Sequence, residues 1–318
     1  MHNLRHFYYQ NKEKIWKVVL IIAFLLGIIY FINNSYKSEE NLNNISNSQA
    51  NNMYSDNENK TYISDKSAVS GTTIKQPEVN KINNTINKFL QYCKNGNIQE
   101  AYSMVSDDCK ENEYSTLEKF NEKYLKDKFS KDAIYQIEKW INDTYKISIS
   151  EDPIATGNIN NTRRVEYITI VDENGQEKLN INSYIGSMQI NKQEIKNEVK
   201  ITVLSKKIYL DYEIYNFKIE NLSNKTIKIN SLKKPKTMYL EDSSGNTYNA
   251  YSHEIYEEEL EVNAKNNINI NIKYANTYSE KNKIGKIVFE DIILDYVEYK
   301  KIENIEQFED ICKLTIYL

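Results

Sequence analysis

Few side chains in this sequence have the type and spacing that chemistry requires. His253 has no Cys, second His or spaced carboxylates near it, a pattern typical of a surface residue rather than a metal ligand. The acidic run Glu257–Glu259, with Glu261, lacks the ligand spacing of a calcium loop and indicates a solvated face. Asp291 and Asp295 flank an apolar tripeptide, as polar residues at a strand end do. We therefore predict no catalytic, cofactor-binding or metal-binding residue.

Cysteine chemistry is also not indicated. The sequence contains no Cys-His pair, no Ser-His-Asp order and no glycine-rich phosphate loop, so no cofactor is expected. If Cys93 closes one helix and Cys109 follows the next, about 16 Å of helix separates them. A disulfide spans Cα atoms no more than about 7 Å apart. We expect Cys93, Cys109 and Cys312 to be free thiols that are mostly buried.

Tyrosine is the most suggestive residue type, with 26 copies against 2 Trp. Tyr brings a large apolar area and one hydroxyl to an interface at low entropic cost. Aromatic residues at alternating positions are ordinarily core residues of strands, so the interface remains the alternative interpretation. The residues concerned are Tyr209, Tyr212, Tyr215, Tyr239, Tyr248, Tyr251 and Tyr256.

An unbroken apolar run, Val18–Ile32, organises the chain around it. With the preceding residues from Ile15, it gives a helix of about eighteen residues and about 27 Å, close to the hydrocarbon thickness of a bilayer. A cleaved signal peptide is the alternative, but Asn33–Tyr36 contains no small-x-small cleavage site and no Cys for lipid attachment. We predict a transmembrane anchor over residues 15–32.

Charge predicts the orientation of this anchor. Before the anchor, positive residues outnumber acidic ones, whereas after it the positive charge is matched by acidic residues. Residues 1–14 are therefore expected in the cytoplasm and the bulk of the chain outside the cell membrane. Residues 33–76 lack clustered aliphatic residues and predict a disordered tether. A net charge of −4 gives no basic excess for phosphate backbones, so nucleic acid is not an expected partner. The charges before the anchor are Arg5, Lys12, Glu13, Lys14 and Lys17, and those after it are Lys37, Glu39 and Glu40.

Helical spacing begins at Pro77 and continues to Phe129. Apolar residues at steps of three and four predict a first helix ending at Asn95-Gly96 and a second ending at Ser106–Asp108. Ser115 and Glu118 match a capping box that opens a third helix. The period then changes to two, which predicts hairpins around the turns Asn142-Asp143 and Asp172–Gly175.

This order of elements resembles a known fold. The run FLQYCKNGNIQEAYSMVSDDCKENEYSTLEKFNEKYL and the strands to about Ile190 look like the cone-shaped NTF2-like α+β domain of membrane-anchored clostridial proteins. The resemblance implies an NTF2-like domain over residues 77–190. Enzymes of this group place an Asp, His or Tyr in the mouth of the cone, but no residue here matches such a position.

From about Glu198 the sequence is strand-like throughout. About seven short alternating segments separated by polar turns are typical of a β-sandwich. The segments YLDYEIYNFKIENLSNKTIKI, YLEDSSGNTY and Ile268–Lys273 resemble immunoglobulin-like sandwiches of bacterial extracytoplasmic proteins. The resemblance implies a β-sandwich domain over residues 191–318. The expected fold class is therefore α+β, with an anchor, an NTF2-like domain and an all-β domain.

These expectations favour an anchored extracytoplasmic module that binds a protein or an envelope polymer without catalysis. One alternative is a scaffold subunit of a secretion or conjugation apparatus, because single-span anchors bearing NTF2-like domains recur there. The other is an enzyme that uses the cone, which a deep pocket with a perturbed Asp or Tyr would support. The oligomeric state is left open by the sequence.

Overall fold

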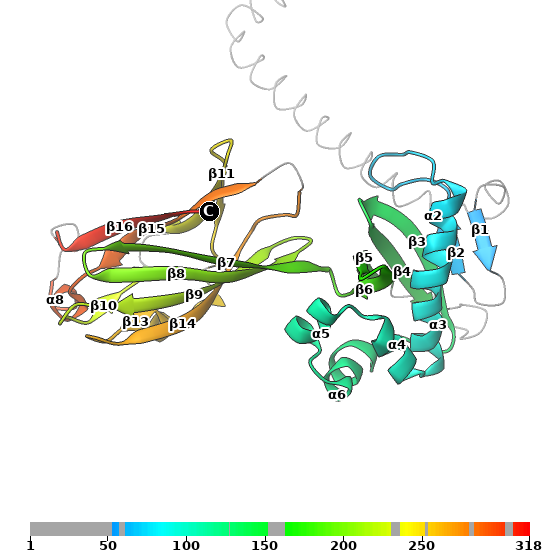
Figure 1. Ribbon diagram of the computed structural model, residues 1–318, viewed down its shortest axis with the longest axis horizontal. Helices are drawn as coiled ribbons and strands as arrows, with labels where there is room; N and C mark the ends of the chain where they lie inside the picture. The colour runs from blue at the N-terminus through cyan, green and yellow to red at the C-terminus, as the bar shows by residue number, and fades with distance from the viewer. Residues whose placement is uncertain are drawn as a thin grey trace, which may run out of the picture. The chain divides into compact units, whose positions relative to one another are not determined.

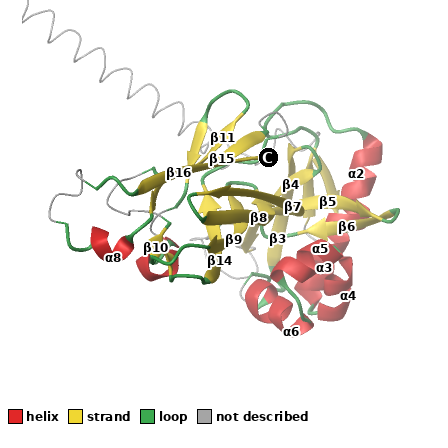
Figure 2. Ribbon diagram, turned by 60° about the vertical axis from the view of Figure 1, so that its left-hand side comes forward, coloured by secondary structure: helices red, strands yellow, loops and turns green. Residues whose placement is uncertain are grey.

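The chain has an α+β architecture, as expected, in the computed structural model (Figure 1). Most helical residues lie between residues 76 and 125, and most strands follow them in the chain. Within residues 76–180 the helices and the strands form two separate layers (Figure 2). The residues described are 53–56, 61–126, 128–151, 163–229, 236–251, 254–279, 283–302 and 308–318.

The predicted tail and anchor, residues 1–32, lie outside the described residues, as does the tether up to residue 52. In the described part of the chain, no helix is both long enough and apolar enough to span a bilayer.

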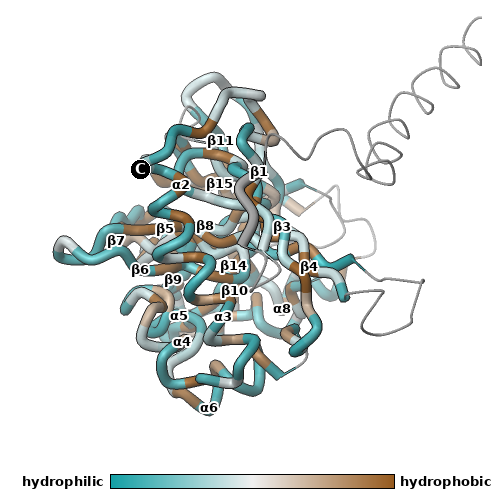
Figure 3. Tube along the Cα trace, turned by 90° about the vertical axis from the view of Figure 1, so that its right-hand side faces the viewer, coloured by the Kyte–Doolittle hydropathy of each residue, from teal (hydrophilic) through white to brown (hydrophobic). Residues whose placement is uncertain are grey.

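The first helical segment runs from Gln76 to Asn95 and ends where the sequence predicts. Pro77 lies in its first turn, where a missing backbone N–H costs little. Gly96 closes it with a φ of +73°, a left-handed conformation that favours glycine. Its predicted apolar face is buried, and hydropathy changes along the helix as the trace turns (Figure 3). The segment consists of α2 (Gln76–Ile82), the π-helical η2 (Asn83–Asn87) and α3 (Lys88–Asn95).

Short helices complete the helical layer, and here two sequence predictions were wrong in detail. Ser106, expected to end a helix, accepts a hydrogen bond from the backbone N–H of Cys109 at 3.0 Å and caps a further helix. The cap of the next helix is Thr116 rather than Ser115, because the Thr116 hydroxyl accepts from the backbone N–H of Lys119 at 3.2 Å. The elements are α4 (Ile98–Met104), α5 (Asp107–Glu113), α6 (Leu117–Phe120) and the π-helical η3 (Asn121–Leu125).

A six-stranded sheet packs against these helices in the order β1-β2-β3-β4-β5-β6. Both predicted hairpins are confirmed. Asn142 turns the first with a φ of 49°, and Asn174 and Gly175 turn the second with φ of 57° and 80°. The strands are β1 (Met53–Asp56), β2 (Thr61–Ser64), β3 (Ala133–Ile141), β4 (Thr144–Glu151), β5 (Arg164–Glu173) and β6 (Gln176–Asn180).

Part of the predicted tether belongs to this folded layer. β2 pairs in parallel with β3, with Ile63 opposite Ile137, although residues 33–76 were expected to be disordered. Ile63 and Ile74 are buried in the helix–sheet core. The tether prediction was therefore wrong for residues 53–56, which form β1 beside β2, and for residues 61–76. The apolar side chains of β2 gain their burial from strands about seventy residues away.

In the described residues after β6, two antiparallel sheets share a second core. Residues 210–212 form the turn between β8 and β9. The first sheet has the order β14-β9-β8-β7, and the second β12-β11-β15-β10-β13 with β16 on β15. The strands are β7 (Tyr184–Lys196), β8 (Val199–Tyr209), β9 (Glu213–Asn221), β10 (Ile227–Lys228), β11 (Met238–Asp242), β12 (Thr247–Asn249), β13 (Glu261–Val262), β14 (Asn267–Tyr274), β15 (Ile284–Ile293) and β16 (Ile311–Tyr317), with short helices η5 (Glu257–Leu260) and α8 (Tyr296–Tyr299).

Polar contacts join α5 to the strands β7 and β8. The Asp108 carboxylate accepts from the Tyr184 hydroxyl at 2.9 Å and from the backbone N–H of Ser187 at 3.0 Å. The Tyr209 hydroxyl donates to Glu113 at 2.6 Å. Tyr184 and Tyr209 also belong to the helix–sheet core. The predicted division at residue 190 consequently falls inside β7, whose first residue packs with the helices.

Candidate binding pocket

A pocket of about 220 Å³ lies where the core-facing side of the six-stranded sheet meets the loop after η3. The strand register explains its position. Ala133 opposes Glu151, and Ile149 opposes Arg164, so these residues form the last rows of the sheet at this end. The pocket is lined by Lys126, Lys128, Phe129, Ser130, Ala133, Ile149, Ser150, Glu151 and Arg164.

Cationic side chains outnumber anionic ones in this lining. Lys126 and Arg164 are exposed, Lys128 is half-buried, and Glu151 is the single carboxylate among the lining residues. Phe129 and Ile149 add apolar surface between them. Such a mixture suits a ligand that bears a negative group and has a neutral body.

A buried ion pair lies directly behind the lining. Lys128 Nζ is 3.0 Å from one carboxylate oxygen of Glu166, whose side chain is only 6% exposed. The other oxygen accepts from the backbone N–H of Asn182 at 2.6 Å. Burial raises the pKa of Glu166, while the charge of Lys128 and its hydrogen bond act in the opposite direction. Lys128 therefore serves both the pocket and the interior.

Aromatic rings fill the interior behind this pair. Phe120 and Tyr124 stack at 5.5 Å, and Phe129 of the pocket lining lies 5.6 Å from Tyr124 and 6.4 Å from Tyr135. The Tyr135 hydroxyl is buried and has no hydrogen-bond partner among the described residues, whereas the buried Tyr124 hydroxyl acts on the Glu166 carboxylate and lowers its pKa. Burial and the nearby Glu166 raise the pKa of Cys93 in the same region.

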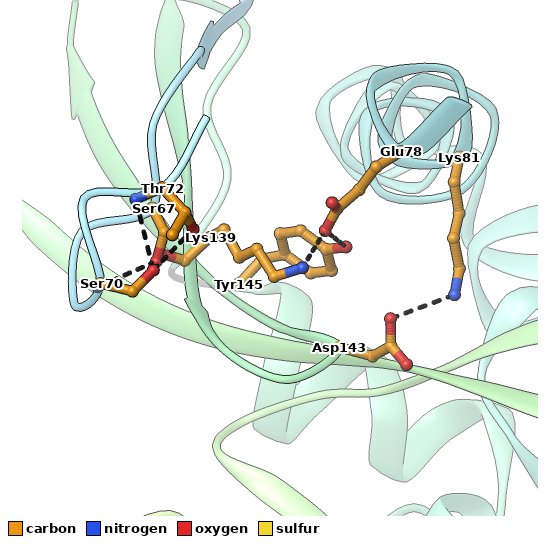
Figure 4. A network of polar contacts seen from close by, with 8 residues as sticks. All are labelled: Ser67, Ser70, Thr72, Glu78, Lys81, Lys139, Asp143 and Tyr145. Atoms are coloured by element: carbon orange, nitrogen blue, oxygen red, sulfur yellow. Dashed lines mark hydrogen bonds and ion pairs between the residues drawn. The ribbon is translucent and has the colours of Figure 1, made fainter. Parts of the chain in front are cut away.

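A separate polar network fixes α2 to the β3–β4 hairpin (Figure 4). Glu78 accepts from Lys139 and, at 3.0 Å, from the hydroxyl of Tyr145, while Lys81 pairs with Asp143 at 3.2 Å. Burial, followed by Glu78, raises the pKa of Tyr145. These residues do not line the pocket, and their contacts hold a helix on a sheet. Hydroxyls of Ser67, Ser70 and Thr72 bond within the loop that precedes α2 (Figure 4).

The acidic candidates of the sequence lie elsewhere, and His253 is outside the described residues. Glu257 begins η5 and Glu261 begins β13. Within the described ranges no group of His, Cys, Asp and Glu is arranged to hold a metal ion. Asp295 caps α8 by accepting from the backbone N–H of Glu298 at 3.0 Å, and this hydrogen bond lowers the pKa of Asp295. Asp291 lies in β15 and is not among the residues that line the pocket.

Most of the suggestive tyrosines contribute to packing. Tyr209 and Tyr215 are buried, and Tyr256 is 71% exposed. Tyr239, Tyr248, Tyr251 and Tyr212 are half-buried. The cysteine prediction is confirmed, since Cys93, Cys109 and Cys312 are free and buried.

Sequence reasoning missed the residues that line the pocket. The chain contains only three Arg, and two of them are the adjacent Arg163 and Arg164 at the start of β5. That pair, in a chain whose other cations are Lys apart from Arg5, is the signal that could have located the site.

The fold and the pocket define an α+β protein with a basic pocket at the open end of a helix–sheet core. Comparison of the chain with family models, with curated proteins and with solved structures found no match. The functional argument therefore proceeds from the geometry of the described residues.

Proposed function

We propose that this chain is a single-span, membrane-anchored binding module that displays its folded part outside the cell membrane. Its helix–sheet part would be an NTF2-like domain and its all-β part an immunoglobulin-like sandwich. The observation that carries the proposal is the ring-filled core. Phe89, Phe120, Tyr124 and Tyr135 are fully buried in it, so the pocket is confined to its open end. A shallow pocket of this kind holds one group of a partner, whether a protein or an envelope polymer.

An enzyme that uses the helix–sheet interior is the alternative. Glu166 is a buried carboxyl that pairs with Lys128 of the pocket lining, and burial raises its pKa, a feature that active sites share. Its two oxygens are, however, engaged by Lys128 and by the Asn182 backbone N–H. This pairing favours a structural role for Glu166 and hence binding over catalysis.

The test uses the full chain in its native cells. A photo-reactive amino acid in place of Lys126, at the pocket rim, is expected to cross-link a specific partner, whereas one in place of the exposed Lys265 in the all-β part is not. Protease added to intact cells is expected to digest the folded part. Digestion only after the cells are opened would refute the proposed location, and equal cross-linking from both positions would refute a pocket-centred function.

A further inference from the structure

The open edge of the four-stranded sheet indicates a kind of partner. β7 ends the strand order β14-β9-β8-β7, with β8 as its hydrogen-bonded neighbour (Figure 1). We propose that a second copy of this chain pairs with this edge, so that residues 191–196 of the two β7 strands run antiparallel across a two-fold axis. The pairing does not involve the pocket, and it adds a self-association surface to the proposed binding function.

The main chain of β7 presents hydrogen-bonding groups to a second strand at Gln193 and Ile195. Two residues of positive φ, Asn197 and Glu198, form the tight turn to β8. The residues that flank such a turn face each other's main chain as a hydrogen-bonded pair, and along an antiparallel strand this direction alternates. Because Lys196 flanks the turn, the main-chain groups of Gln193 and Ile195 point away from β8.

Two features limit the open part of the edge to this stretch. Before it, the backbone N–H of Ser187 already donates to Asp108 of α5 at 3.0 Å, and a bulge shifts the register with β8 between Gln189 and Lys192. From residue 191 to 196 every residue is exposed, and in the described part of the chain no element other than β8 bonds to their main chain. The open edge is therefore six residues long, bounded by the bulge and by the turn.

Unpaired charges distinguish this edge. Lys192 and Glu194 oppose buried residues of β8, so both side chains lie on the core-facing side of the sheet. Both residues are nevertheless exposed, and neither has an ion-pair partner within the described ranges. Lys196, by contrast, donates to the main-chain carbonyl of Lys313 at 2.9 Å. Inward-pointing charges on an edge strand discourage pairing with most strands, so a partner must carry opposite charges at matching positions.

A second copy supplies those charges. With Gln193 opposite the partner's Gln193, Lys192 lies opposite the partner's Glu194, and Glu194 opposite the partner's Lys192. These are non-hydrogen-bonded pairs, in which side chains of an antiparallel sheet come closest. Registers shifted by two residues place Glu194 opposite Glu194, or Lys192 opposite Lys192, and are disfavoured. The favoured register also joins the outward main-chain groups of Gln193 in the two copies and covers Ile195, which is 53% exposed.

The experiment places a cysteine at the centre of the pairing. Two full chains that carry Gln193→Cys and different epitope tags are expressed together in the native cells and treated with a membrane-permeant oxidant. The Cα atoms of a hydrogen-bonded pair lie about 5.5 Å apart, within the range that a disulfide spans, so a linked dimer with both tags is expected. The matched control is Asn269→Cys, because Asn269 is exposed in the same row of the sheet but on the opposite edge strand, β14. It is expected to give at least about tenfold less dimer.

Charge reversal then tests the register. Adding Glu194→Lys to the Gln193→Cys chain creates two like-charged pairs, so the yield of linked dimer is expected to fall about tenfold. Adding Lys192→Glu as well makes the facing charges opposite again and is expected to restore the yield. Linkage of Gln193→Cys to a different protein, equal dimer from Asn269→Cys, or no recovery in the doubly reversed chain would overturn the proposal.

Discussion

Replacing Lys128 with methionine removes the cation from a buried ion pair, while the Asn182 backbone N–H still donates to Glu166. Breaking a buried pair in this way costs about 3–5 kcal/mol. Because the Lys128 side chain is 28% exposed, solvent screens the pair in part, and we expect a loss of about 3 kcal/mol in the free energy of unfolding at about pH 8.

The pH dependence of this loss has a definite sign. Burial raises the folded-state pKa of Glu166 above its ordinary value of 4.5. The contribution of this group to stability is therefore fully present below the unfolded-state pKa and is lost as the pH rises through the folded-state pKa. Lys128→Met raises the folded-state pKa further, since it removes the stabilising charge. The variant is thus expected to approach the unchanged chain in stability as the pH falls towards 4.5.

Urea unfolding followed by the fluorescence of Trp140 measures this effect, in a Trp16→Phe background that leaves one Trp. Trp140 lies in β3 and packs against Tyr167 at 5.5 Å, so it reports on the helix–sheet part. Adding Glu166→Gln to Lys128→Met is expected to restore more than half of the lost stability, because no buried charge then lacks its partner. The control Lys123→Met, at an exposed position, is expected to change stability by less than about 0.5 kcal/mol. A loss that is independent of pH, or a double variant as unstable as the single one, would refute the reasoning.

Three further predictions concern the rest of the fold. A chain that begins at Pro77 is expected to have a free energy of unfolding lower by on the order of 4 kcal/mol than one that begins at Ser55, because Ile63 and Ile74 leave the core. Equal urea midpoints, measured by the fluorescence of Trp140, would contradict this. Asn221→Ala is expected to lower the free energy of unfolding by about 3 kcal/mol, because the Asn221 amide donates to three backbone carbonyls. Urea unfolding followed by circular dichroism measures this loss, and an equal loss in the control Asn224→Ala, at an exposed position, would refute the prediction. Burial raises the pKa of Cys109 to about 12, so the native thiols are expected to react with a disulfide reagent at about pH 8 only after denaturation; prompt labelling would contradict their burial.

Local patterns predicted much of the secondary structure. Asn95-Gly96 and Asn174-Gly175 determine their own backbone conformations, since each supplies a positive φ that other residues rarely adopt. The helix from Pro77 carries its apolar stripe in its own sequence and needed no tertiary information. The α5 helix was missed because Ser106 and its acidic neighbours can either end a helix or begin one. β2 was missed because four residues in a polar segment are not distinctive until β3 provides the partner.

The sequence of β5 alone predicts only part of the pocket. Alternation along β5 places Arg164, Glu166 and Ile168 on one face, with Glu166 and Ile168 buried against the helices and Arg164 exposed at the end of the row. Two charged residues at the start of an otherwise apolar face therefore indicate the open end of a core, and this could have been predicted from the sequence. That Lys128 would pair with Glu166 required the loop after η3 to return to β5, a contact between residues thirty-eight positions apart. Arg163 precedes the strand and bonds to Ser148 instead, so two adjacent arginines have different environments. Only a residue on the core-facing side of β5 can reach the pocket, which is why Arg164 lines the pocket and Arg163 does not.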